Sequence, residues 1–303
     1  MPTLLVQVSG HGFGHWGQTV PVLRELHARV ARLRIVVRSA LDPAAVRSRF
    51  PQVDEVLSCD SDRGLAMRST VDVSVADSHD RYVEELGDWE RGVAEDCRAL
   101  DAVRPDAVLS NVGYRVLAAA ARLGVPALAL SSLNWADVYL AYAHGLPGAG
   151  RVYARLLECY RGAAGFVRVT PGIAMPQLDN IIDVGPVAAQ VPTADVRGAL
   201  GLAPDTTLLA AALGGIPTII DTRHWPTPAG AHWLCPPGFD GRMPGRLGWP
   251  EGRRFEEVVG ACDAVVTKVG YGSLLEAASR GVRILYAGRP GWPEDTPFAD
   301  WLA

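Results

Sequence analysis

The chain has 303 residues, of which 49% are hydrophobic and 20% are charged, with a formal net charge of −4. This length predicts two domains of similar size, and the slightly acidic balance excludes the basic surface of a nucleic-acid-binding protein. The five dispersed cysteines predict reduced thiols, not disulfides or a zinc site.

The N-terminus has neither the charged region nor the long apolar region of a signal peptide. No stretch approaches the about 20 apolar residues that a membrane span needs. A cytoplasmic protein without an integral membrane segment is therefore expected.

Strands and helices alternate along the first 190 residues. Short apolar runs predict strands, and apolar residues at helical spacing predict helices. The predicted strands are residues 4–8, 34–37, 53–57, 107–110, 126–130, 166–169 and 181–184, and the predicted helices are 19–32, 78–103 and 116–123. This order predicts a parallel sheet with right-handed crossovers.

A second unit of the same type begins near residue 193. Its predicted helices are residues 194–200, 255–260 and 273–279, its predicted strands are 208–213, 232–235, 264–266 and 283–286, and residues 217–250 are expected to be mainly loops. We predict an α/β fold of two Rossmann-like, doubly wound domains, residues 1–190 and 194–303. Such sheets bind ligands at the carboxyl ends of their strands.

The first glycine-rich turn is Ser9-Gly10-His11-Gly12-Phe13-Gly14-His15. Its glycines permit close approach of the backbone to a ligand, and the helix that follows favours an anion at its N-terminus. The spacing differs from the dinucleotide pattern G-x-G-x-x-G, so a nicotinamide cofactor is not expected. The alternative is a tight turn without a ligand.

Two histidines of this turn, His11 and His15, are four residues apart. That spacing suits a metal only on a helix, whereas the glycines predict a loop, and no third ligand is evident. We expect no metal. A general base is the better role, and His15, at the start of the helix, is the leading candidate.

Two loops of the second unit follow predicted strands. Gly214 and Gly215 can present backbone N–H groups to a phosphate, although a simple glycine turn is equally consistent with them. The stronger candidate is Thr267-Lys268-Val269-Gly270-Tyr271-Gly272-Ser273, which combines a lysine with a helix N-terminus.

Three acidic residues are further candidates. Glu276 either forms a capping box with Ser273 or accepts hydrogen bonds from two ribose hydroxyls. Glu294 and Asp295 are expected to be exposed loop acids, at a sheet edge where sugar hydroxyls can be bound.

These motifs together resemble those of GT-B glycosyltransferases, in particular the glycosyltransferase-like N-terminal half of plant-type L-arabinokinases and related bacterial predicted glycosyltransferases. The matching stretches extend over nearly the whole chain. They are Val8-Ser9-Gly10-His11-Gly12-Phe13-Gly14-His15, Ser132-Leu133-Asn134-Trp135-Ala136-Asp137, Leu213-Gly214-Gly215-Ile216-Pro217, Lys268-Val269-Gly270-Tyr271-Gly272-Ser273-Leu274-Leu275-Glu276 and Glu294-Asp295-Thr296-Pro297-Phe298.

The resemblance implies that a nucleotide-diphosphate sugar binds mainly to the second domain and a hydroxyl-bearing acceptor to the first. It implies His15 as the base, with His11 beside it, and inversion without a metal or other cofactor. The implied acceptor-side residues are Asn134, Trp135 and Asp137. The implied donor-side residues are Gly12, Gly14, Gly214, Gly215, Lys268, Gly270, Tyr271, Gly272, Ser273, Glu276, Glu294 and Asp295.

Two departures accompany this resemblance. Gln18 stands where related sequences usually carry arginine, and the second domain is expected to be short because the chain ends at Ala303. No kinase half is present, so sugar-kinase activity is not implied. Two alternatives to glycosyl transfer remain: a nucleotide-sugar-binding or regulatory module without catalysis, and a nucleotide-sugar epimerase, which needs further acid and base carboxylates.

Overall fold

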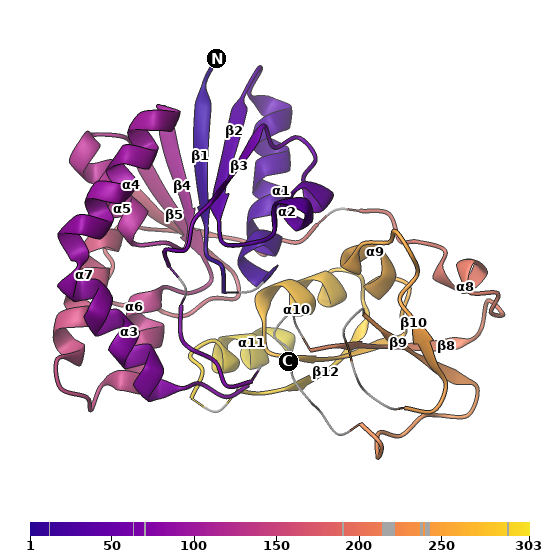
Figure 1. Cartoon of the computed structure of the whole chain (residues 1–303). Helices are drawn as coiled ribbons and strands as arrows, with labels where there is room; N and C mark the ends of the chain where they lie inside the picture. The colour runs from indigo at the N-terminus through magenta and orange to yellow at the C-terminus, as the bar shows by residue number, and fades with distance from the viewer. Residues whose placement is uncertain are drawn as a thin grey trace.

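A seven-stranded parallel sheet forms the first half of the computed structural model (Figure 1). The structure describes residues 1–11, 13–62, 64–69, 71–189, 191–213, 222–236, 239, 243–289 and 291–303. The strands lie in the order β3 (Glu55–Ser58), β2 (Arg34–Ser39), β1 (Thr3–Val8), β4 (Ala107–Asn111), β5 (Ala127–Ser131), β6 (Gly165–Val169) and β7 (Ile181–Val184). The order reverses between β1 and β4, the switch point where doubly wound sheets open a crevice.

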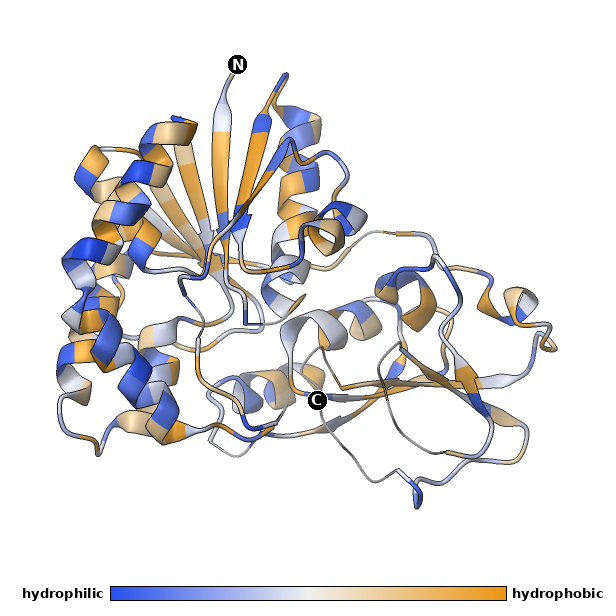
Figure 2. Ribbon diagram, viewed as in Figure 1, coloured by the Kyte–Doolittle hydropathy of each residue, from blue (hydrophilic) through white to orange (hydrophobic). Residues whose placement is uncertain are grey.

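Alternating residues of these strands are buried on opposite faces of the sheet, as the two-residue period of a strand requires. Leu5 packs against α3 to α7 on one face, whereas its neighbour Val6 packs against α1 and α2 on the other. The apolar strands therefore lie between two helical layers (Figure 2). The helices are α1 (Phe13–Arg29), α2 (Pro43–Arg49), α3 (Val75–Gly87), α4 (Trp89–Val103), α5 (Arg115–Leu123), α6 (Trp135–Ala143) and α7 (Ala149–Arg161).

A five-stranded parallel sheet forms the second half, in the order β10 (Arg246–Gly248), β9 (Ala231–Cys235), β8 (Thr207–Ala212), β11 (Ala264–Lys268) and β12 (Arg283–Ala287). The predicted α/β class with two parallel sheets is confirmed. The helices of this half are α8 (Val196–Ala199), α9 (Phe255–Val259), α10 (Tyr271–Ala278) and α11 (Asp295–Leu302). The predicted boundary at residues 190–193 lies in the connection from β7 to β8 and stays a prediction.

The two halves meet where α10 crosses α1 (Figure 1). A Cβ atom added to Gly272 would lie 3.9 Å from the Cα of Gly14, so the two backbones nearly touch. Leu274, Leu275 and Phe298 of the second half are buried in the same apolar cluster as the α1 side of the first sheet. The two domains thus share a continuous core at this crossing.

Several predicted elements differ from the structure. The first helix begins at Phe13, so His15 lies in its first turn. The predicted helix over residues 78–103 is two helices, because the chain breaks at Asp88. Helices α2, α6 and α7 and strand β10 were not predicted, since their local apolar patterns are short or irregular. Among the described residues, no helix combines the length and apolar character needed to cross a membrane.

The shared core predicts a large stability loss when it is truncated. Leu274→Ala removes a fully buried side chain at the crossing and should lower the free energy of unfolding by about 2–5 kcal/mol. Chemical denaturation followed by tryptophan fluorescence measures this. Leu285→Ala, at a side chain that is 60% exposed, is the control and should stay within about 0.5 kcal/mol. Equal small effects in both variants would contradict the shared core.

Candidate functional site

A cavity of about 320 Å³ lies between the two domains, at the carboxyl ends of strands from both sheets. The first turns of α1 and α10 both line it, through Gly14 and His15 on one side and Gly270, Tyr271, Gly272 and Ser273 on the other. Unpaired N–H groups at helix N-termini attract anions. The cavity therefore receives two such termini. Gly12, Gly214 and Gly215 lie outside the described residues.

His15 is held in place by Asn111, the last residue of β4. The His15 Nδ1 and Asn111 Oδ1 atoms are 2.9 Å apart. The amide nitrogen of Asn111 donates to the His15 carbonyl and to Gln18 Oε1, at 3.2 Å each, so its amide oxygen faces the imidazole. We infer that Nδ1 carries the proton and that Nε2 is left as the acceptor.

Burial lowers the pKa of His15 below its ordinary value. The hydrogen bond that His15 donates to Asn111 and the charge of Glu294 oppose this shift, whereas the charges of Arg289 and Lys268 add to it. The imidazole is 7% exposed and is therefore neutral near pH 7. Three of the charges that act on it come from the second domain, so the electrostatics of His15 depend on both halves.

A chain of buried hydrogen bonds continues from Asn111 into the second domain. Gln18 Nε2 donates to Ser132 Oγ at 2.8 Å, and Ser132 Oγ donates to Glu294 Oε1 at 2.6 Å. The indole N–H of Trp292 donates to the other oxygen of Glu294 at 2.8 Å. Glu294 is thus buried and fully engaged, and the expectation that it is an exposed loop acid is wrong.

Asp295 is not among the described residues that line the cavity. It is the first residue of α11, and its carboxylate accepts a hydrogen bond from the backbone N–H of Arg289. This contact holds the loop that follows β12. Asp295 is half-buried and is absent from the described lining of the cavity, so its part in donor binding stays a prediction.

Two cations of the second domain line the cavity. Lys268 ends β11, and burial together with the nearby Arg289 lowers its pKa to about 8. The Arg289 guanidinium lies 3.7 Å from the centre of the Trp292 ring and 3.7 Å from Glu294 Oε2. Both groups are desolvated, so an anionic ligand would interact strongly with them.

Glu276 connects α10 to the segment between the domains. One of its carboxylate oxygens accepts from the backbone N–H of Ala189 and the other from Arg280, each at 2.8 Å. The capping-box interpretation is wrong: the N-cap of α10 is Gly270, no side chain caps it, and Ser273 lies within the helix. Glu276 also lines the cavity, and the free lone pairs of its oxygens can still accept hydroxyl hydrogens.

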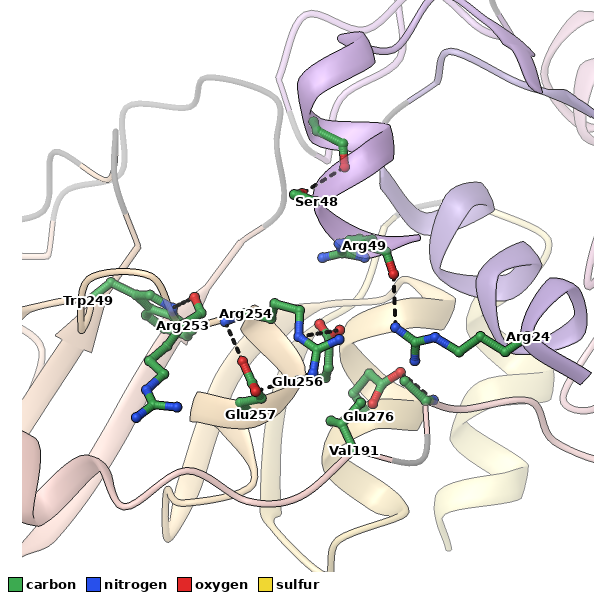
Figure 3. Close-up of polar contacts among 12 residues, drawn as sticks. Arg24, Ser48, Arg49, Val191, Trp249, Arg253, Arg254, Glu256, Glu257 and Glu276 are labelled. Carbon is green, nitrogen blue, oxygen red and sulfur yellow. Dashed lines mark hydrogen bonds and ion pairs between the residues drawn. The ribbon is translucent and has the colours of Figure 1, made fainter. Parts of the chain in front are cut away.

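Charged side chains of both domains surround this end of the cavity (Figure 3). Arg49 and Glu256 line it with Glu276. Arg24 of α1 donates to the Arg49 carbonyl at 2.8 Å, and the charges of Glu256 and Glu276 act on its guanidinium. Carboxylates of α9 and α10 thus face arginines of α1 and α2 across the interface.

His11 and Trp135 form the aromatic side of the cavity in the first domain. The His11 ring lies edge-on to Trp135, with centroids 5.1 Å apart, and stacks on Trp292 at 6.3 Å. His15 also meets Trp135 edge-on at 5.6 Å. All four rings line the cavity, which gives it an apolar wall beside the base candidate.

Asn134 and Asp137 have a structural role instead of lining the cavity. The Asn134 side chain caps α6 by accepting from the Asp137 backbone N–H at 2.8 Å, and its amide donates to the Asp137 carboxylate at 2.7 Å. Neither residue is among the described lining of the cavity. Their polar atoms are engaged in the cap of α6. Contact of either residue with an acceptor stays a prediction.

Within the described ranges, no three histidine, cysteine, aspartate or glutamate side chains are arranged to hold a metal ion. His11 and His15 do not share a helix face, since α1 begins only at Phe13.

Sequence reasoning missed Asn111, Ser132, Arg289 and Trp292. The signal for Asn111 was its position at the carboxyl end of a strand next to β1, where ligand-site residues gather. Ser132 carried the same signal after β5. The partners of Asn111 and Ser132 are far away in the chain, on α1 and in the second domain, so no local pattern reveals those pairings.

The fold of the chain is similar to the folds of several solved structures. UGT2 of Phytolacca americana, complexed with UDP-2-fluoro-glucose and pterostilbene, aligns with a TM-score of 0.63 at 15% identity, over 100% of this chain and 83% of that one. The glycosyltransferase SnogD of Streptomyces nogalater aligns with a TM-score of 0.56 at 17% identity, over 100% and 85%. The fold is that of the GT-B glycosyltransferases.

A third structure with the GT-B fold, a UGT transferase of Siraitia grosvenorii in complex with UDP, aligns with a TM-score of 0.55 at 15% identity, over 99% of this chain and 84% of that one. In sequence, L-arabinokinase of Arabidopsis thaliana is 26% identical over 309 residues, which cover 96% of this chain. The chain spans 28% of the length of that relative. No family model matches the chain.

The Asn111 contact predicts how His15 responds to charge. Asn111→Asp places a carboxylate beside Nδ1 and should raise the pKa of His15, because a negative neighbour stabilises the imidazolium. NMR titration of the imidazole measures the shift. Asp183→Asn, on the exposed end of the sheet, is the control and should leave the titration unchanged. An unaltered pKa in Asn111→Asp would contradict the contact.

Proposed function

We propose that the chain is a glycosyltransferase that moves a sugar from a nucleotide-diphosphate sugar to a hydroxyl group of an acceptor, with inversion and without a metal. The observation that carries this proposal is the cavity between the domains. In it, the neutral imidazole of His15 faces the N-terminus of α10 and the cationic Lys268. A base opposite an anion site is the arrangement that such a transfer requires.

The donor would bind mainly to the second domain. Lys268 and the backbone N–H groups at the start of α10 suit a diphosphate, since a point charge and a helix N-terminus act on the same group. Glu276 suits the ribose hydroxyls. Glu294 suits the sugar hydroxyls, which would replace Ser132 and Trp292 as donors to its oxygens.

The reaction would be a single displacement. The acceptor oxygen forms a bond to the anomeric carbon while the bond from that carbon to the diphosphate oxygen breaks, and His15 Nε2 takes the hydroxyl proton. One displacement inverts the anomeric centre. The diphosphate leaves with its charge stabilised by Lys268, Arg289 and the helix N-terminus, which together replace the role of a divalent cation.

The comparisons support the substrate class. One structural neighbour was solved with UDP-2-fluoro-glucose and another with UDP, so UDP and UDP-sugars are the first ligands to test. The L-arabinokinase relative is matched over only 28% of its length, and kinase activity is not part of this proposal.

One observation favours a second function, a nucleotide-sugar-binding module without catalysis. The partner of His15 is the uncharged Asn111, whereas a carboxylate in this position stabilises the imidazolium that forms when the base accepts a proton. Burial lowers the pKa of His15 further. Both features weaken the base and leave ligand binding intact.

The donor site predicts selective stabilisation by nucleotides. UDP or another nucleoside diphosphate should raise the melting temperature in a thermal-shift panel of nucleotides and nucleotide sugars. Lys268→Ala should lower the affinity for that nucleotide by roughly 10- to 100-fold, which is the effect of losing a charged hydrogen bond. Arg283→Ala, at an exposed position of β12, is the matched control. A folded protein that responds to no member of the panel rules out the donor site.

A variant at His15 should distinguish glycosyl transfer from nucleotide binding. His15→Ala should reduce transfer by about 10²- to 10⁴-fold, as loss of a general base does, while the affinity for the nucleotide changes little. Product formation and nucleotide titration measure the two effects. His144→Ala, at an exposed position, serves as the control. Turnover that is unchanged in His15→Ala would remove His15 as the base, and absence of turnover in the wild type with every donor that binds would favour the binding module.

A further inference from the structure

A second cavity, of about 370 Å³, lies within the first domain. It opens at the carboxyl ends of β3 and β4 and is framed by α3, α4 and the start of α5. The inner end of this cavity, called its floor below, is next to the switch point between β1 and β4, where the strand order reverses. Crevices at this position of a doubly wound sheet are where ligands bind.

Two polar side chains on the floor have no hydrogen-bond partner among the described residues. Both carboxyl oxygens of Asp62 and the hydroxyl of Tyr82 are buried and unpaired, in residues that are 3% and 4% exposed. Both residues line the cavity. Buried polar groups are nearly always hydrogen-bonded, so these atoms call for a partner that the described part of the chain does not supply.

A glycine makes room for the Asp62 carboxyl group. A Cβ atom added to Gly113 would lie 2.8 Å from Asp62 Oδ2 and 3.0 Å from Gln7 Cγ, closer than real Cβ atoms come. Gly113 follows β4, and Gln7 lies on β1. The backbone at the switch point thus accommodates the carboxyl group of a residue that lines the cavity.

The charge of the cavity favours a cation. Its described lining residues include six carboxylic acids and three arginines. Glu85 accepts from the Tyr114 hydroxyl at 2.5 Å and lies 3.6 Å from Arg115, and Arg115 also donates to Asp96 at 2.6 Å. The Arg115 guanidinium is therefore paired with Glu85 and Asp96 and not with Asp62.

Burial, and then the charge of Glu85, raise the pKa of Asp62 well above its ordinary value. A positively charged ligand would reverse this effect, because an opposite charge favours the ionised form. A metal ion fits poorly, since no set of three suitable side chains is found in the part of the chain that the structure describes.

We propose that this cavity binds a small polyhydroxylated amine, with its ammonium group paired to Asp62 and a hydroxyl bonded to Tyr82. An ammonium group offers donors to both unpaired carboxyl oxygens, and hydroxyl groups suit the phenol and the acidic rim, which includes Glu84 and Glu95. The acidic excess also draws cations toward the cavity.

The cavity shares a wall with the cleft between the domains. Ser9 Oγ donates to the Asp62 carbonyl at 3.0 Å. A Cβ atom on Gly64 would lie 2.6 Å from the Trp135 ring and 3.1 Å from His11, and those two rings line the cleft. Binding of the amine in this cavity does not depend on glycosyl transfer.

The test uses two probes that differ in one group. Glucamine (1-amino-1-deoxysorbitol) carries an ammonium group at neutral pH, and sorbitol carries a hydroxyl group in its place. Titration of the full chain, without nucleotide, by ligand-observed NMR or calorimetry gives both affinities. We expect glucamine to bind the wild type at least tenfold more tightly than sorbitol. Equal affinities, or no binding of glucamine, would overturn the proposal.

Variants locate the site. Asp62→Asn keeps the shape but cannot ionise, and should remove the preference for glucamine. Tyr82→Phe should weaken both probes and retain the preference. Asp300→Asn, at an exposed position of α11, is the control and should match the wild type. A preference that persists in Asp62→Asn overturns the assignment, and so does spermidine, a cation without hydroxyl groups, binding as tightly as glucamine. Since no nucleotide is present, failure of the donor site cannot produce either result.

Discussion

The contact on which the rest of the structure depends is the crossing of α1 and α10 at Gly14 and Gly272. The two helices lie close together there, since a Cβ atom added to Gly272 would be in van der Waals contact with the Cα of Gly14, 3.9 Å away. Leu274, Leu275 and Phe298 then join the core of the first domain, so the domains are held by shared apolar burial, as parts of one domain are. The crossing also directs both helix N-termini at the same cavity. The position of the anion site relative to His15 is a consequence of this packing.

A chain of polar groups crosses the same interface and requires an uncharged residue at its centre. Gln18 donates to Ser132 and accepts from Asn111. Arginine has donors only and could not accept from Asn111. The glutamine that departs from the related sequences therefore matches its surroundings. It links the partner of His15 to Glu294 of the second domain through groups that all have hydrogen-bond partners, which limits the cost of burying them.

Asn111 orients the His15 ring but does little to stabilise its protonated form. Asn111 fixes the imidazole in one orientation, but it brings no negative charge to favour the protonated form. Burial and the cations of the second domain lower the pKa of His15 further. Binding of an anionic donor would neutralise those cations and so restore part of the basicity. On this view, the donor itself would adjust the base, and the two domains act as one electrostatic unit.

Local pattern was enough to predict the architecture and several of the residues that line the cavity between the domains. Apolar runs that alternate with helical segments fix parallel sheets, and glycines beside His15 and Lys268 at strand ends mark the loops that line the cleft. The limits of α1 and the break at Asp88 were not predicted, because helix ends depend on contacts beyond the local pattern.

Tertiary structure alone decided which partners these residues have. The sequence placed His15 at a glycine-rich turn, but only the pairing of β1 with β4 brings Asn111 to its ring. It marked Glu276 as a helix residue for capping or ribose binding and Glu294 as an acid near a sheet edge. Only the domain contact gives them Ala189 and Ser132 as donors. Asp62 stood in no motif, and its unpaired carboxyl group emerged only from the folded switch point. The sequence determines elements through local periodicity and turn chemistry, whereas burial and hydrogen bonding at the site depend on residues far apart in the chain.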